Sequence, residues 1–354
     1  MELSGRSADR LARLLRWITA IAVVLLAILM AAIWVFASPT ALRADFAASD
    51  CRRVSLRDDV TGNLIVGAED MALTLSENEI LLTAHDRQDL AAPSGGLYSI
   101  SVFALETQDV SVTARRLYGG DDADQAFRPH GMALSSDGTR IALVNRPVVG
   151  TAEVLIGPVD DQAWAPEQRL TGERLCRAND LEFSGEADGM LNITLDRSDC
   201  LSSIRDLLPG AGTGRLARFD GAGLTDTIDG LAFPNGIAAG YVAETRRRSI
   251  RTPDGGYLRV PGGPDNLNID QDGWIVAALH PKLVHLWLYR EGWRNNAPSR
   301  IVRVDPSDEE VRVLYDDVEG ALFSGATSAI YGDGLLVLGS AYDEGLLVCQ
   351  QGLQ

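Results

Sequence analysis

The chain has 354 residues, of which 46% are hydrophobic, so it is long enough to bury a sizeable core in one large domain. Its 32 Lys and Arg residues stand against 49 Asp and Glu residues, which gives a formal net charge of −17. A chain this acidic repels phosphate backbones, which excludes nucleic acid as an expected partner, whereas its carboxylates suit hard cations. Its 35 glycines fall mostly at turns between short apolar runs, a pattern that favours an all-β architecture.

The N-terminal segment differs from the rest of the chain. Residues 17–37 read WITAIAVVLLAILMAAIWVFA, which is uncharged and long enough as a helix to cross a bilayer core of about 30 Å. Because cationic flanks stay in the cytoplasm, the arginines before it place everything after residue 37 on the other side, which is periplasmic, extracellular or lumenal. We therefore predict a cytoplasmic basic N-terminus (1–16), a transmembrane helix or signal anchor (17–37), a linker (38–50) and an exported domain (51–354). A cleaved signal peptide is the alternative for residues 1–37.

Cysteine usage agrees with export. An even set without metal-site spacing, lying wholly in the exported part, predicts two disulfides, and buried free thiols are the alternative. Spacing alone leaves the pairing open, although a bond between the first and last cysteine would fasten the ends of the domain together. The four residues are Cys51, Cys176, Cys200 and Cys349.

A polar start, an alternating apolar run, a Gly-containing turn and a second apolar run recur six times along the exported part. Each copy predicts a β-hairpin with room for two further strands, and Asp-Gly pairs such as Asp137-Gly138 serve as its tight turn. Six four-stranded units predict an all-β, six-bladed propeller, whereas the rival β-sandwich has no place for a sixfold repeat. The copy at Asn235 is abbreviated, so its blade should be short or irregular. The copies begin at Glu69, His130, Asn179, Asn235, Asp265 and Thr327.

If the six hairpins are equivalent inner strands, their starts converge at one end of the central channel. The residues there are carboxylates and amides, the all-oxygen set that Ca²⁺ prefers, with one imidazole and no thiolate, which disfavours zinc. A dication is the simplest way to compensate such a cluster of buried acids. The alternatives are that these residues cap turns and that His130 is a packed core histidine. The cluster contains Glu69, Asp70, His130, Asn179, Asp180, Asn235, Asp265, Asn266, Thr327 and Ser328.

An ordered set of motifs carries a resemblance to a known family. The motifs are GAEDMAL, PHGMALS, ANDLEF, FPNGI, PDNLNIDQDGWIVAALHP and LLVLGSAYDEGLLVC. From about Cys51 to Cys349 the chain resembles the paraoxonase (arylesterase) family, in the superfamily of calcium-dependent six-bladed propellers that also holds gluconolactonases. The resemblance implies a disulfide between these two cysteines, an extra one between Cys176 and Cys200, and a hydrophobic N-terminus that acts as a membrane or lipid anchor.

The resemblance also implies two calcium ions with separate ligand sets. The catalytic ion would be held by Glu69, Asn179, Asn235, Asp265 and Asn266. The structural ion would be held by Asp70, Asp180 and the backbone carbonyl of Met132.

The chain departs from the family at the proposed base, which is a pair of histidines in the family. Arg146, in LVNRP, stands where the second histidine is expected, and arginine cannot accept a proton. This leaves His130 alone, or Glu69 or Asp265, to take the proton from the attacking water. Arg146 would either steady an anionic group of the substrate or form an ion pair with a neighbouring acid.

The expected activity is calcium-dependent hydrolysis of a carboxylic ester or lactone, in which the cation polarises the carbonyl and an activated water attacks. No GxSxG motif is present, so a serine nucleophile is not expected. Two alternatives remain: a sugar-lactone hydrolase of the gluconolactonase kind, and a non-catalytic exported propeller, stabilised by calcium, that binds a protein or glycan. His280 matches a family position lining the substrate pocket, whereas His85 and His285 match none and are expected to be structural or exposed.

Overall fold

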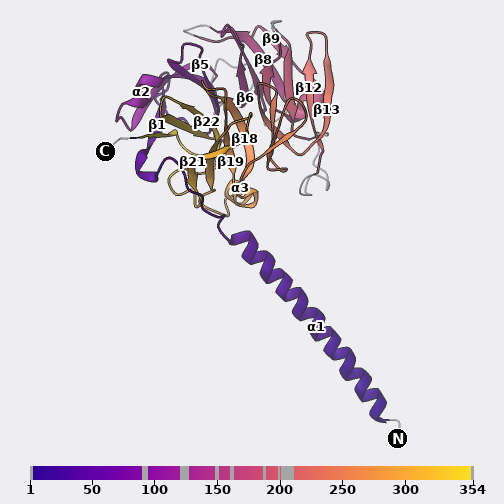
Figure 1. The fold of residues 1–354 in the computed structure, drawn as a ribbon. Helices are drawn as coiled ribbons and strands as arrows, with labels where there is room; N and C mark the ends of the chain where they lie inside the picture. The colour runs from indigo at the N-terminus through magenta and orange to yellow at the C-terminus, as the bar shows by residue number, and fades with distance from the viewer. Residues whose placement is uncertain are drawn as a thin grey trace. The chain divides into compact units, whose positions relative to one another are not determined.

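The computed structural model describes residues 3–89, 95–119, 127–147, 151–159, 163–185, 189–197, 200 and 211–351, and the chain divides into two compact units, Met1–Pro39 and Thr40–Gln354. The first unit contains the single helix α1 (Leu3–Phe36), drawn in indigo in Figure 1. Its stretch Leu15–Ile33 is long and apolar enough to cross a membrane, and none of it is buried. The predicted apolar helix is confirmed, and it fits a signal anchor or a signal sequence.

The second unit contains four separate four-stranded sheets, each made of strands that are consecutive in sequence. Two of them consist of β6 (Pro129–Leu134), β7 (Arg140–Asn145), β8 (Glu153–Pro158) and β9 (Gln168–Leu170), and of β10 (Ala178–Phe183), β11 (Leu191–Leu195), β12 (Gly214–Phe219) and β13 (Leu224–Leu231). The other two consist of β14 (Pro234–Ala238), β15 (Tyr241–Glu244), β16 (Ser249–Arg251) and β17 (Tyr257–Arg259), and of β18 (Gly263–Ile269), β19 (Ile275–His280), β20 (Ser299–Val304) and β21 (Val311–Asp317).

One eight-stranded sheet in the order β2-β3-β4-β5-β1-β24-β23-β22 completes the domain. Its strands are β1 (Cys51–Asp58), β2 (Ala68–Leu73), β3 (Glu79–Ala84), β4 (Gly96–Ser101), β5 (Ser111–Gly119), β22 (Ala326–Gly332), β23 (Leu335–Ser340) and β24 (Leu346–Gln350). Three short helices lie between strands, α2 (Val102–Glu106), α3 (Leu283–Arg290) and η3 (Glu173–Arg177), and η1 (Ala48–Asp50) precedes β1.

The all-β, propeller-like architecture is confirmed, but the predicted number of six separate blades is not: four are counted as separate sheets. The reason is that β1 pairs at both of its edges, antiparallel with β24 and parallel with β5, which joins eight strands into one sheet. The repeat periodicity could not reveal a strand that belongs to no hairpin.

All six predicted hairpins are present as antiparallel pairs, namely β2–β3, β6–β7, β10–β11, β14–β15, β18–β19 and β22–β23. The copy at Asn235 is short as expected, because its sheet has strands of three to five residues. Gly138, Gly273 and Gly334 have positive φ values of 72°, 80° and 77°, as tight turns require. The turn residues 186–188 of the Asn179 copy lie outside the described residues.

The first strands of the six hairpins contact one another in a closed ring, in the order β2, β6, β10, β14, β18 and β22. We call these six the inner strands. Because they run in the same sense within equivalent hairpins, their starts lie together at one end of the ring, which we call the hub end. The turns of the hairpins lie at the opposite end.

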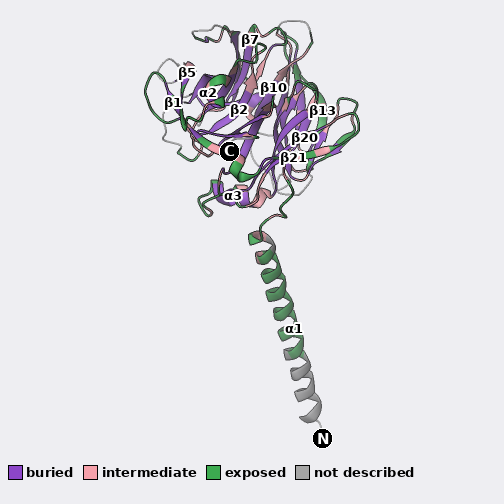
Figure 2. Ribbon diagram, turned by 60° about the vertical axis from the view of Figure 1, so that its left-hand side comes forward, coloured by how far each residue is buried: buried purple, intermediate pink, exposed green. Residues whose placement is uncertain are grey.

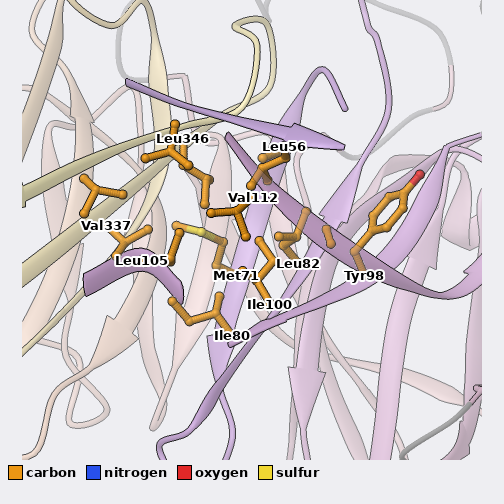
Figure 3. Close-up of a cluster of buried hydrophobic side chains, with 14 of the residues drawn as sticks. Leu56, Met71, Ile80, Leu82, Tyr98, Ile100, Leu105, Val112, Val337 and Leu346 are labelled. Atoms are coloured by element: carbon orange, nitrogen blue, oxygen red, sulfur yellow. The ribbon is translucent and has the colours of Figure 1, made fainter. Parts of the chain in front are cut away.

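The core lies between the faces of neighbouring sheets, so the strands are buried on both sides, as the purple strands of Figure 2 show. Figure 3 shows one cluster, in which Leu56 of β1, Met71 of β2, Val337 of β23 and Leu346 of β24 lie close together. This cluster thus packs together residues from both halves of the eight-stranded sheet.

Two disulfides join the cysteines, Cys51 with Cys349 and Cys176 with Cys200, and both predicted pairs are confirmed. Cys51 and Cys349 face each other across the β1–β24 ladder. The covalent link therefore closes the ring at the place where the first strand of the domain meets the last.

Residues 40–46, which follow α1 in the chain, pack against the sheet made of β18–β21. The backbone N–H groups of Asp45 and Phe46 donate to the carbonyls of Val313 and Leu314, and the Phe46 ring is buried. The Arg300 guanidinium donates to the carbonyl of Thr40 at 2.8 Å. Residues 40–46 therefore belong to the folded domain.

Candidate functional site

Each inner strand carries one residue more than its partner at the hub end. Three steps along β10, from Ala178 to Leu181, oppose two steps along β11, from Leu195 to Ile193. Equivalent register shifts occur in β2, β6, β14, β18 and β22. A β-bulge bends the strand and redirects its side chains. This explains how consecutive residues such as Asn179 and Asp180 are both buried in the hub.

Buried oxygens without hydrogen-bond partners gather in these bulged segments. Among the described residues, Glu69 Oε2, which is in ion pairs, and Ser328 Oγ belong to this set, and its other members are Asn179 Oδ1, Asp180 Oδ1, Asn235 Oδ1 and Asn266 Oδ1. Leaving a buried acceptor unsatisfied costs about 1–3 kcal/mol, and native proteins rarely leave several together. Four such oxygens, contributed by three inner strands, are what a bound cation would satisfy.

The other polar atoms of these side chains are held in place. Asp180 accepts from the Ile237 N–H through Oδ2 at 2.8 Å, and Asn266 donates through Nδ2 to the Glu69 carbonyl at 3.1 Å. Asp70 accepts from the Met132 N–H through Oδ2 at 2.8 Å. Each bond crosses from one sheet to another, so the hub is preorganised by the backbone around it.

Threonines of the hairpins fasten neighbouring inner strands together: Thr194 and Thr83 lie on second strands, and Thr327 lies on the inner strand β22. Thr194 Oγ1 of β11 lies 2.6 Å from the Asn235 carbonyl, and it accepts from the Asp180 N–H at 3.0 Å. Thr83 Oγ1 of β3 donates to the His130 carbonyl at 2.7 Å, and Thr327 Oγ1 donates to the Glu69 carbonyl at 2.7 Å.

We expect Thr194→Val to lower the free energy of unfolding by about 2 kcal/mol, because the isosteric change leaves a buried carbonyl and a buried N–H without partners. Urea denaturation monitored by tryptophan fluorescence measures this loss. Thr225→Val on exposed β13 of the same sheet is the control, and we expect it to change stability by less than about 0.5 kcal/mol. Equal effects of the two substitutions would contradict the role of Thr194.

Two glycines allow the strands to approach at the hub. A Cβ at Gly131 would lie 2.2 Å from Asp180 Oδ1, and one at Gly236 would lie 2.6 Å from the backbone of Asp265 and Asn266. Any larger residue would push these inner strands apart. The glycines of PHGMAL and FPNGI thus keep the site residues close together.

The deep carboxylates are poorly stabilised as anions. Burial raises the pKa of Asp70 to about 7, the backbone N–H groups of Met132 and Met71 offset part of that rise, and Asp265 adds to it. Burial also raises the pKa of Asp180 well above its usual value, with the charge of Asp70 as the second cause. A cation between these two carboxyl groups would offset both the burial and the mutual repulsion that disfavour their ionised forms.

At the hub end, Glu69 meets an imidazole and a guanidinium. His130 Nδ1 lies 2.6 Å from Glu69 Oε2, and the Arg87 guanidinium contacts both side chains. Burial lowers the pKa of His130 well below its usual value, and the charges of Arg87 and Arg146 lower it further. His130 is therefore neutral at pH 7 and can accept a proton.

A second imidazole–carboxylate pair lies across the hub. His280 Nε2 is 2.6 Å from Asp265 Oδ2, and both residues are buried. His280, which was predicted to line the substrate pocket, therefore directly contacts Asp265, a predicted calcium ligand. This contact fixes the orientation of the Asp265 carboxylate.

Three further residues from the sequence analysis, Arg146, His85 and His285, have the following environments. Arg146 lies 3.5 Å from Asp196 Oδ2, so it faces an acid, as one of its two expected roles requires. His85, which was expected to be structural or exposed, has its Nδ1 3.0 Å from the Pro129 carbonyl, and it contributes to the low pKa of His130. His285 is fully buried in α3.

Arg87 is the site residue that the sequence analysis did not identify. It lies three residues after β3, in the loop that the hairpin places at the hub end. Burial lowers its pKa to about 10, so its guanidinium stays charged at neutral pH. The position of the loop relative to the repeat was the signal that could have indicated it.

Two hollows bracket the hub. A cavity of about 560 Å³ follows the inner strands beyond Asp70 and Asp180 and reaches the hairpin turns. A second, of about 510 Å³, lies between the loop after β3 and the end of α3. Its lining is mostly polar: Gln88, Tyr289, Arg290, Glu291, Gly292, Arg294 and Asn295. The loop after β3 and helix α3 both follow second strands, so the second hollow is at the hub end.

The donor chemistry fits a hard cation. Within the described part of the chain, no group of three or more His, Cys, Asp or Glu side chains is placed to hold a metal. The unpartnered atoms are mainly amide oxygens, which Ca²⁺ accepts and which zinc does not prefer. The residues present therefore fit calcium by type, by burial and by their unsatisfied oxygens.

Comparison with known proteins places the chain by fold only. No protein-family model matches it. A strictosidine synthase-like protein of Arabidopsis thaliana is 30% identical over 143 residues, and the match spans 36% of each chain. A solved protein of unknown function from Bacteroides thetaiotaomicron superposes with a TM-score of 0.51 at 15% identity, over 85% of this chain and 75% of that one. A gluconolactonase from Xanthomonas campestris gives a TM-score of 0.46 at 17% identity, over 81% and 88%.

Proposed function

We propose that this protein is a calcium-dependent hydrolase of carboxylic esters or lactones, anchored to a membrane by α1 with its catalytic domain on the non-cytoplasmic side. The observation that supports this most strongly is the set of four buried, unpartnered amide and carboxylate oxygens at the hub. Two further proposed ligands, Glu69 and Asp265, each contact an imidazole at 2.6 Å. These are the His130 and His280 side chains, which supply acid–base groups beside the candidate cation site.

The proposed ligands divide into two sets. Bound calcium would polarise the substrate carbonyl and stabilise the negative charge that develops on its oxygen. The catalytic ion would be held by Glu69, Asn179, Asn235, Asp265 and Asn266. A structural ion would be held by Asp70, Asp180 and the carbonyl of Met132, a role supported by the raised pKa values of the two acids.

His130 is the proposed general base. It is neutral, since burial, Arg87 and Arg146 all lower its pKa, and its Nδ1 is held by Glu69. The imidazole would take a proton from the attacking water, and Glu69 would stabilise the imidazolium that forms. His280 is a positioning residue, because its contact with Asp265 fixes the orientation of that carboxylate.

We further propose that the eight-stranded sheet serves as two blades, β2–β5 on one side and β22–β24 with β1 on the other. The closed ring of six inner strands supports this division. It would make the domain a six-bladed propeller, with the motifs of the paraoxonase-like branch and a hub shared with gluconolactonases.

One observation favours a polar lactone among the possible substrates. The hollow at the hub end is lined by Gln88, Arg290, Arg294 and Asn295. Apolar side chains would be expected around a long acyl chain, whereas such donors suit hydroxyl or carboxyl groups. A sugar-lactone hydrolase is therefore the second candidate.

Hydrolysis of a neutral aryl ester and of δ-valerolactone and gluconolactone, by a domain comprising residues 40–354, tests the proposal. We expect turnover with 1 mM Ca²⁺ that falls at least about a hundredfold in excess chelator and returns on readdition of calcium. Binding of ⁴⁵Ca²⁺ is measured in parallel. Tight calcium binding without turnover on any substrate would instead indicate a non-catalytic, calcium-stabilised propeller, and absence of binding would overturn the metal site.

A further inference from the structure

The loops at the hub end carry a repeated positive charge that the chain as a whole does not share. Five of the six second strands are followed within three residues by Arg or Lys, although the net charge is −17. We call these residues the basic rim. They are Arg87 after β3, Arg146 after β7, Arg197 after β11, Arg246 after β15 and Lys282 after β19.

Acidic residues are frequent at the opposite end of the ring. The turns between first and second strands carry acidic residues there: Glu77, Asp137, Asp270, Asp272 and Asp333. Two of these acids, Asp270 and Asp272, pair with Arg303. Clefts lined by one sign of charge concentrate ligands of the other sign.

Some acids at the hub end are engaged by partners outside the basic rim, whereas Asp196 lies 3.5 Å from Arg146 and 3.9 Å from Arg197. Asp343 pairs with Arg53, and Glu244 pairs with Arg247 at 2.8 Å. Asp86 accepts from two backbone N–H groups of its own loop. Asp343, Glu244 and Asp86 are thus held by groups outside the rim.

Members of the rim differ in what they contact. Arg197 and Arg246 both lie over the ring of Phe233, at 5.8 and 5.0 Å from its centroid. Arg146 has a long contact of 3.5 Å with Asp196, whereas charge-assisted hydrogen bonds are about 2.7–2.9 Å. The Arg146 side chain is 26% exposed, so a substrate anion can reach it.

Arg87 contacts Glu69, and its side chain is 20% exposed. In the proposed function Glu69 is a calcium ligand, and the cation would take over this carboxylate as a counter-ion. Arg87 also contacts His130, the proposed base. The backbone N–H of Arg146 donates to the carbonyl of Arg128, two residues before His130, so both arginines belong to segments that border this imidazole. A negative group held by them would lie beside the reacting centre.

We propose that the substrate is an anionic ester or lactone, and that Arg87 and Arg146 bind its negative group. This inference rests on the proposed hydrolase function and names its substrate class. Arginine suits this task because its planar guanidinium binds carboxylate or phosphate oxygens in a bidentate manner. Arg146 then fills the place of the missing second histidine as a specificity-determining residue.

The test compares 4-acetoxybenzoate with its methyl ester, which transfer the same acyl group and differ by one negative charge. We expect the ratio of their kcat/KM values, anion over neutral ester, to fall about tenfold in Arg146→Gln, the size of a lost hydrogen bond to a charged group. Arg146→Lys should keep most of the preference. Arg140→Gln, at the opposite end of the same strand β7, is the matched control and should leave the ratio unchanged.

Replacing the carboxylate with a phosphate, in 4-acetoxyphenyl phosphate, distinguishes the two possible anions, because only the preferred one should show the full loss in Arg146→Gln. If Arg146→Gln lowers kcat/KM equally for charged and neutral esters, Arg146 is merely structural and the inference is overturned. If no ester is hydrolysed at all, the proposed function fails separately. Calorimetric binding of 4-hydroxybenzoate and its methyl ester to the calcium-loaded protein then still tests the anion site, with the same tenfold difference expected in Arg146→Gln.

Discussion

Asn179→Ala is expected to weaken calcium binding about a hundredfold and to reduce ester or lactone hydrolysis at 0.1 mM Ca²⁺ by at least the same factor. Asn179 Oδ1 is buried at the hub with no hydrogen-bond partner, so the fold gains nothing from it. Removing it should therefore cost the metal-free protein little or no stability. What is lost is one oxygen of a cation site, and a hundredfold loss corresponds to about 2.7 kcal/mol of binding free energy.

Two measurements separate this result from simple misfolding. Isothermal titration calorimetry gives the calcium affinity, and thermal denaturation with and without calcium gives the stabilisation by the ion, which should shrink as the dissociation constant rises. Asn192→Ala is the control, since this asparagine of the same sheet donates to Glu182 at 2.9 Å and is not in the bulged segment of β10. Wild-type calcium affinity in Asn179→Ala would refute the assignment of the ligands.

The hairpins could be predicted from the sequence because each copy repeats the same local order of polar start, apolar run and turn. The polar starts also indicated the hub, since equivalent strands bring equivalent positions together. The β-bulges could not be predicted, because one extra residue changes neither composition nor the apolar pattern. Yet the bulges are what bury both Asp265 and Asn266 in the hub.

Contacts between loops were the other part that sequence could not supply. The position of Arg87 after a second strand recurs in other hairpins, but its contact with Glu69 depends on how the loop after β3 folds over β2. The contact of His280 with Asp265 likewise spans β18 and β19 and follows from their register. A pattern along the chain gives positions on strands, whereas distances across the hub require the packed structure.

The closure of the ring is visible in both the strand pairing and the covalent structure. Since β1 is paired with β24 and with β5, the two halves of the eight-stranded sheet depend on one strand near the start of the domain. If β1 detaches, both halves lose their shared neighbour and the inner strands β2 and β22 are free to separate. The Cys51–Cys349 disulfide acts at this junction.

Replacing Cys51 and Cys349 together with Ala is expected to lower the free energy of unfolding by about 5 kcal/mol, because the link closes a loop whose ends are 298 residues apart. Chain entropy predicts a smaller loss, about 3 kcal/mol, when Cys176 and Cys200, 24 residues apart, are both replaced with Ala. Guanidinium denaturation of the oxidised protein and the two double variants measures the difference.

The affinity for calcium should respond differently to the loss of each disulfide. Loss of the Cys51–Cys349 link loosens β2 and β22, which hold Glu69 and Thr327, so we expect calcium affinity to fall with stability. Loss of the other link, which joins the loops around β10 and β11 at the edge of one sheet, should leave affinity within about threefold of the wild type. If the two double variants lose the same stability and the same affinity, closure at β1 contributes nothing specific to the hub, and the site is held by its own interstrand bonds alone.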